Sequence, residues 1–164
     1  MRWGQFVADC PELGGLAGEM IADRHIVLLG SLRADGSPRI SALECDVAGD
    51  DLYTGMIWQS VKALDLVRDD RITLHSLPAG LSNPAGDLKL YGRAVDVRDP
   101  AGREAYGEVI FARLEWRPDE PYHCFAYDIT AAGFVRFEGD GRDVWTWREG
   151  RGFRRDRLPE LSPR

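Results

Sequence analysis

Short β-forming runs, separated by turn signals at intervals of about ten residues, constrain this chain most strongly. Asp35-Gly36 stands between two such runs, and Gly49-Asp50 supplies the next turn signal. The pattern predicts strands at residues 26–32, 38–45, 52–56, 71–77, 87–97, 122–130, 133–138 and 143–147. Helical segments fall between some of these strands rather than after each one. The pattern therefore favours an antiparallel barrel with appended helices over a doubly wound parallel sheet.

Three segments carry helical signals. Residues 11–24 place apolar side chains at an amphipathic helical spacing. A second helix is predicted at 60–69, with Ser60 as its N-cap. Asp99-Pro100 is a helix-start signal and predicts a third helix at about 101–114. The two prolines and two glycines of residues 78–86 predict a loop.

Ser60 and Lys62 lie where the strand at 52–56 gives way to a helix. The first amides of a helix lack internal partners and carry partial positive charge, so they favour an anion. A hydroxyl and an ammonium group beside those amides would complete a phosphate seat. Lys62 is one of two lysines, against nineteen arginines, so the arginine bias does not account for it. The alternative is that Ser60 merely caps the helix and Lys62 is solvated.

The chain has 164 residues, which suggests a single domain. Its expected parts are an N-terminal helix at about 11–24, a barrel at about 26–148 and a basic tail at 149–164. A net charge of −6 disfavours generic nucleic-acid binding. No apolar run approaches the roughly 20 residues that cross a bilayer, and the first residues lack a signal-peptide stretch. We therefore expect a cytoplasmic protein without membrane partners. The odd number of cysteines, three, indicates free thiols in a reducing compartment.

The order of these features resembles the pyridoxamine 5′-phosphate oxidase-like, FMN-binding split-barrel family. The resemblance covers roughly residues 20–158. It is carried by the Asp-Gly turn followed by Pro38-Arg39, by Leu52-Tyr-Thr-Gly, by Ser60-Val-Lys62 and by Arg71-Ile-Thr-Leu. It implies a mainly β (α+β) fold, a six-stranded antiparallel split β-barrel with appended helices, and a homodimer that binds flavin between its subunits.

The resemblance also implies site residues. Arg39, Ser60 and Lys62 would contact the FMN phosphate. Backbone from Ser41 to Leu43, and from Thr54 to Met56, would lie along the flavin ring and ribityl chain. Trp58, His75 and Trp147 would border the open face of the ring.

The C-terminal residues from Trp147 to Arg157 are similar to the signature of the true oxidases, in which the matching tryptophan and arginine contact flavin. Two departures argue against vitamin B6 oxidation. Phe153 and Arg155 stand where the true oxidases have a substrate-gripping arginine and histidine, and Glu44 stands where they have a phosphate-binding lysine.

No other motif points to catalysis. His25, His75 and His123 are far apart, without cysteine or carboxylate at metal-ligand spacing, so no metal site is predicted. Gly-x-Gly-x-x-Gly, Walker and Gly-x-Ser-x-Gly motifs are absent from the sequence. No catalytic residue is identified.

The leading hypothesis is an FMN-dependent oxidoreductase that transfers hydride between the flavin and a small substrate, whose identity the sequence does not reveal. Such an enzyme mainly positions the ring, so it needs no acid–base dyad. Two alternatives stay open. One is a reductase that uses the deazaflavin coenzyme, and the other is a non-catalytic module that binds flavin or haem.

Overall fold

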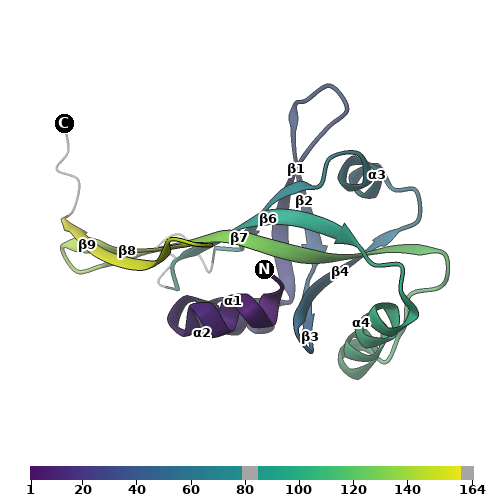
Figure 1. The fold of residues 1–164 in the computed structure, drawn as a ribbon, viewed down its shortest axis with the longest axis horizontal. Helices are drawn as coiled ribbons and strands as arrows, with labels where there is room; N and C mark the ends of the chain where they lie inside the picture. Colours follow the sequence, from purple (N-terminus) through teal and green to yellow (C-terminus); the bar gives the residue numbers. More distant parts are fainter. Residues whose placement is uncertain (79–84, 160–164) are drawn as a thin grey trace.

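The computed structural model describes residues 1–78 and 85–159, and these form an α+β fold with four helices and one antiparallel sheet (Figure 1). The expected loop at 78–86 falls largely outside the described residues. The helices are α1 (Trp3–Asp9), α2 (Pro11–Arg24), α3 (Val61–Arg68) and α4 (Pro100–Leu114). The strands are β1 (Ile26–Leu32), β2 (Pro38–Glu44), β3 (Asp46–Ala48), β4 (Asp51–Ile57), β5 (Arg71–Ser76), β6 (Asp87–Asp96), β7 (Tyr122–Glu138), β8 (Gly141–Arg148) and β9 (Gly152–Pro159).

The strands are hydrogen-bonded in the order β2-β1-β5-β6-β7-β4-β3, and β8 pairs with β7 and β9. The two ends of this order come back toward each other, because β2 contacts β4. No ladder joins these two strands within the described part of the sheet. The barrel is therefore split between β2 and β4.

The sheet of the described residues has nine strands, where the sequence pattern predicted eight and the resemblance implied a barrel of six. The short β3 and the C-terminal β9 were not predicted, and neither was α1. The two strands predicted at 122–130 and 133–138 are one continuous β7, whose pairing with β6 contains an irregularity after Tyr91. A bulge of this kind bends a strand without ending it, which is why the sequence at 131–132 resembled a break.

Residues 149–164 were expected to be a basic tail, but residues 152–159 of this segment form β9. β9 pairs along its whole length with β8, which in turn pairs with the second half of β7. These three strands extend beyond the barrel as an arm (Figure 1). Ladder hydrogen bonds thus order a segment whose arginine-rich sequence has little apolar side chain to bury.

The main core fills the barrel with alternate side chains of its strands. Leu29, Leu74, Leu90 and Phe125 are all nearly inaccessible. Helices α1 and α2 cover one side of the sheet and add Phe6 and other apolar side chains to the same core. Such burial contributes about 25 cal/mol for each Å² of apolar surface removed from water.

A second cluster lies between the other face of β4 and β7 and helix α4. Tyr53 and Tyr122 of the strands pack against Tyr106 and Ile110 of α4. Helix α4 begins where predicted, because the Asp99 side chain accepts a hydrogen bond of 2.7 Å from the Gly102 amide and Pro100 occupies the first helical turn. This helix thus forms one border of the β4 edge.

Helix α3 is tied to the barrel by a buried carboxylate. Asp65 accepts hydrogen bonds from Arg39 Nε on β2 (2.6 Å) and from Arg68 Nη1 (2.9 Å). Arg68 also donates to the Leu32 carbonyl at the end of β1. Burial acts to raise the pKa of Asp65, but the hydrogen bonds and charges of the two guanidinium groups outweigh it and lower the pKa. The carboxylate is therefore ionised and holds α3 over one end of the barrel.

The Asp65 clamp generates a pH prediction. Asp65→Asn should lower the free energy of unfolding by about 3 kcal/mol at pH 7, because it removes one partner from a buried ionic group. Because folding lowers the pKa of Asp65, the ionised carboxylate stabilises the fold fully only at pH values above the pKa of the unfolded carboxyl. The difference in unfolding free energy between wild type and Asp65→Asn should therefore shrink as the pH falls below about 4. Urea unfolding at several pH values measures it. Asp23→Asn, in an exposed pair with Arg24, is the control and should cost less than about 1 kcal/mol. A difference that does not vary with pH would contradict the ionised clamp.

The close approach of β6 and β7 generates a second prediction. A Cβ atom at Gly92 would overlap the Asp128 carbonyl oxygen, which is backbone and cannot rotate away. Gly92→Ala should therefore lower the free energy of unfolding by about 1–3 kcal/mol. Gly133→Ala is the control, because its Cβ would meet no atom closer than 4.0 Å. Equal melting temperatures for the two variants would contradict this account of the bulge.

Candidate functional site

A cleft of about 620 Å³ lies at the split between β2 and β4, a volume typical of small-molecule sites. We call it the Trp58 cleft. Strand β2 contributes Leu43 and Glu44 and β4 contributes its last three residues, while α4 and the segment after it form the opposite wall. The lining residues are Leu43, Glu44, Gly55, Met56, Ile57, Trp58, Lys62, Tyr106, Trp116, Pro118, Asp119, Pro121 and Tyr122.

Three of the residues expected to bind the cofactor line this cleft together: Met56, Trp58 and Lys62. Met56 is buried, whereas Trp58 is 48% exposed and stands in the connection from β4 to α3. Lys62 lies in the first turn of α3 and is half-buried. Within residues 1–78 and 85–159 its ammonium group has no ion-pair partner, so this charge is available to a ligand.

Ser60 occupies the N-cap position of α3 by its backbone, but its hydroxyl does not cap the helix. The Oγ atom is buried and lacks a hydrogen-bond partner among the described residues. Simple capping, the alternative reading of Ser60, therefore does not describe its side chain. Ser60 is not among the residues that line the cleft, but Trp58 and Lys62, two residues before and after it in the chain, are.

Arg39, Ser41 and Thr54 lie on strands at the split, but none of them lines the cleft. Arg39 is paired with Asp65 and lines a different hollow from Lys62. The Thr54 hydroxyl is fully buried and lies 2.6 Å from the Tyr127 hydroxyl, with which it shares a hydrogen bond. Ser41 is half-buried on β2 opposite Leu29. The expected cradle of Arg39, Ser60 and Lys62 is thus only partly assembled in one chain.

The remaining three expected residues lie outside the cleft. His75 on β5 is hydrogen-bonded through Nδ1 to the Ser76 carbonyl (2.6 Å). Trp147 is buried at 2% exposure, donates through Nε1 to Asp9 (2.8 Å) and packs against Phe6, so its role within this chain is to hold α1 on the sheet. Arg157 lies on β9 in the arm, at the opposite end of the molecule from α3 (Figure 1).

Sequence reasoning missed the aromatic wall formed by Tyr106, Trp116 and Tyr122. The sequence alone did not reveal that α4 and the segment after it turn back onto the end of β4. Burial raises the pKa of Tyr106 and of Tyr122, so both phenols stay neutral near pH 7. Glu44 adds a carboxylate that is 3.0 Å from Arg113. The cleft therefore combines neutral aromatic surface with one cation, Lys62, and two carboxylates, Glu44 and Asp119.

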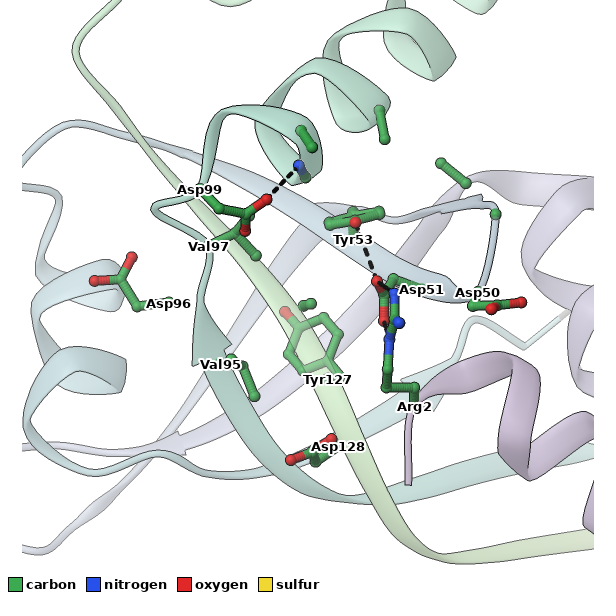
Figure 2. A pocket seen from close by; sticks show the side chains of 16 residues that line it. Arg2, Asp50, Asp51, Tyr53, Val95, Asp96, Val97, Asp99, Tyr127 and Asp128 are labelled. Atoms are coloured by element: carbon green, nitrogen blue, oxygen red, sulfur yellow. Dashed lines mark hydrogen bonds and ion pairs between the residues drawn. The ribbon is translucent and has the colours of Figure 1, made fainter.

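A second hollow, of about 640 Å³, lies between the start of β4, the end of β6 and α4, and Figure 2 shows its acidic lining. Asp51 is held there by Arg2 and by the Tyr53 hydroxyl (3.1 Å), and the hydrogen bond from Arg2 lowers the pKa of Asp51. Asp99 caps α4. The aspartates that have partners here serve structure, and the excess of carboxylates makes this hollow unsuitable for a phosphate.

Residues 1–78 and 85–159 contain no group of three or more histidine, cysteine, aspartate or glutamate side chains placed to hold a metal ion. None of the helices in the same part of the chain is long and apolar enough to span a membrane.

Solved structures share this fold. A pyridoxamine 5′-phosphate oxidase-related, FMN-binding protein from Nostoc punctiforme is 14% identical with a TM-score of 0.66, over 91% of this chain and 96% of that one. A Clostridium acetobutylicum protein related to general stress protein 26, of the pyridoxinephosphate oxidase family, is 17% identical with a TM-score of 0.60, over 84% and 96%. A haem-binding protein from Mycobacterium smegmatis is 14% identical with a TM-score of 0.64, over 93% and 90%.

No family model and no curated protein matches the sequence. At these identities the likeness to solved structures establishes the fold and leaves the ligand to be argued from the site. The chain therefore has the split-barrel fold of the pyridoxamine 5′-phosphate oxidase-like proteins, as its sequence pattern predicted.

Proposed function

We propose that this chain binds FMN in the Trp58 cleft and is a flavin-dependent oxidoreductase. The observation that carries the proposal is the Lys62 side chain, which lines the cleft without an ion-pair partner among the described residues and follows, by two residues, a buried and unpartnered Ser60 hydroxyl at the start of α3. A buried hydroxyl without a partner costs about 1–3 kcal/mol, which a bound phosphate oxygen would recover. The likeness in fold to FMN-binding proteins supports the same reading.

The donor set at the start of α3 suits a phosphate ester. The first intrahelical bond runs from the Leu64 amide to the Ser60 carbonyl, so the amides before Leu64 have no acceptor within the helix. These amides, the hydroxyl and the Lys62 ammonium all donate, and their hydrogen bonds to an anion are charge-assisted. Because Arg39 is already paired with Asp65, Lys62 makes the main cationic contact with the phosphate in this proposal.

The flavin ring would lie along the split. The edges of β2 and β4 that face each other there are not paired with one another, so their amides and carbonyls can contact a ring without breaking a ladder. Met56, Trp58 and Tyr122 would supply apolar surface and exclude water. FMN brings the hydride chemistry when bound, and the protein holds and orients the ring.

The Glu44 carboxylate limits which substrates the cleft can accept. Its carboxylate lines the cleft and would repel a phosphate group placed next to it. Only part of this charge is offset, because Arg113 also pairs with Asp46. We therefore propose a small substrate without a phosphate at this end of the cleft, and not pyridoxamine 5′-phosphate.

Exposed apolar side chains around α3 favour a homodimer. Val61, Leu64 and Val67 follow one another on the outer face of the helix, and Ile57 (81% exposed) and Ile40 (75%) lie on the strands at the split. Apolar side chains gathered at this density on a surface mark a contact with another molecule. A second copy packed here would border the cleft. In such a dimer, an arm residue of one subunit, such as Arg157, could reach a flavin bound to the other subunit.

Haem binding is the second candidate, because one protein of the same fold is a haem-binding protein. The visible spectrum of purified protein separates the candidates. Oxidised FMN absorbs in two bands in the blue and near-ultraviolet, the deazaflavin coenzyme in one violet band, and haem in a sharp Soret peak. If FMN is present, its bleaching by reduced nicotinamide under argon favours the oxidoreductase over a carrier.

The phosphate seat generates a binding prediction. Lys62→Ala combined with Ser60→Ala should weaken FMN binding by about 2–4 kcal/mol, because two charge-assisted bonds to the phosphate are lost. Quenching of flavin fluorescence on titration measures the affinity. Lys89→Ala, which removes the other lysine of the chain from β6, should leave affinity unchanged. Unchanged FMN affinity in the double variant would remove α3 from the site.

The apolar face generates an association prediction. The wild-type chain should have the mass of two chains by light scattering at micromolar concentration. Val61→Asp with Val67→Asp should give the mass of one chain, because two carboxylates would have to be buried in the interface. Val95→Asp, at an exposed position on β6 beside the second hollow, is the control and should stay dimeric. A monomeric wild-type protein would leave a two-subunit site untenable.

A further inference from the structure

His123 is a buried polar side chain next to the cleft that the proposed function does not use. It lies on β7 opposite Met56 and is 7% exposed. Its Nε2 atom is buried and has no hydrogen-bond partner in the described part of the chain. An imidazole nitrogen buried without a partner loses the hydrogen bond that it makes with water in the unfolded chain. Native structures keep few such atoms, and those they keep often serve a ligand.

The imidazole is held in one orientation by stacking. The Trp58 indole stacks on the imidazole, with ring centroids 4.5 Å apart and ring planes inclined by 17°. The Phe125 ring makes a second stacked contact with the imidazole, with a centroid distance of 6.0 Å and an angle of 8°. Phe125 belongs to the barrel core and cannot move without disrupting it. Trp58 is the half-exposed member of the stack. Movement of the Trp58 indole is therefore the least disruptive way to uncover His123.

The backbone beside Trp58 carries strain. Gln59 has a φ of 58°, in the left-handed region that side chains other than glycine rarely adopt. The next residue, Ser60, has a buried hydroxyl without a partner among the described residues. A strained residue between a half-exposed indole and an unpartnered hydroxyl is typical of a segment that changes conformation when a ligand binds.

His123 is adjacent to the cleft. Trp58, stacked on the imidazole, lines the cleft, and so do Met56 across the ladder and Tyr122 before it in the chain. A group that displaces the indole from within the cleft would meet His123 next. The aromatic walls of the cleft select a flat ring for this position.

We propose that His123 is a further ligand-contacting residue and that Trp58 is its displaceable cover. A planar heteroaromatic ring bound in the cleft moves the Trp58 indole aside, and a polar atom at the edge of that ring forms a hydrogen bond with His123 Nε2. The inference rests on the proposed function, because the ring it concerns is that of the flavin. It assigns the ring-recognising contact to β7, whereas the phosphate contacts belong to α3.

FMN and lumiflavin test this assignment, because lumiflavin carries the same ring without the ribityl phosphate. His123→Phe keeps the stack with Trp58 and removes the nitrogen. It should weaken the binding of both ligands about tenfold, the equivalent of one hydrogen bond. His123→Gln, which restores a polar side chain, should bind better than His123→Phe.

Thermal unfolding without ligand supplies an independent readout. His123→Phe should melt at a higher temperature than wild type, because it removes a buried nitrogen without a partner. Trp145→Phe is the matched control, since Trp145 also has a buried, unpartnered nitrogen but lies on the arm. It should change the melting temperature in the same direction and leave flavin affinity unchanged.

The outcomes separate this inference from the proposed function. If Lys62→Ala weakens FMN binding while His123→Phe leaves both ligands unaffected, the phosphate seat stands and the role of His123 is wrong. If wild type binds FMN but not lumiflavin, the ring contact is wrong and the seat again stands. If wild type binds neither flavin, both proposals fall. A lower melting temperature for His123→Phe would show that Nε2 has a partner and would overturn the inference.

Discussion

The unpaired edges of β2 and β4 determine the rest of this site. A sheet that curls into a barrel either closes by hydrogen bonds or leaves two strands with unsatisfied backbone groups, which must be covered or paired elsewhere. In this chain β2 and β4 meet without a ladder. Helix α3 covers one end of the split, and α4 with the segment after it forms the wall beside β4. The cleft exists because the sheet stops short of closing.

The polar residues at α3 fall into two groups, one that stabilises the fold and one that is available for binding. Asp65 is buried and requires positive partners, and it takes Arg39 and Arg68. This clamp fixes the helix but removes Arg39 from the donors that face the cleft. Lys62, three residues earlier, has no such partner in the described chain, and the Ser60 hydroxyl is also unused. Stability and binding thus use different side chains of one short helix.

Local signals predicted much of the fold. The bounds of α2 and β1 match the expected residues, since proline at the first helical turn and an Asp-Gly turn are signals within a few residues of the chain. β9 was missed because its partner strand, rather than its own composition, makes it a strand. For the site, the expected residues Met56, Trp58 and Lys62 line one cleft, whereas Trp147 packs against a helix that was not predicted at all.

The sequence by itself determined the order of strands and helices, the split-barrel class and the place of a cation at the start of α3. These depend on residues close together in the chain. Only the tertiary structure decided that Asp65 occupies Arg39, that α4 brings Tyr106 to the cleft, and that Trp58 covers His123. Each of these contacts joins separate elements of the fold. The choice among possible partners depends on how the elements pack, which periodicity and spacing do not encode.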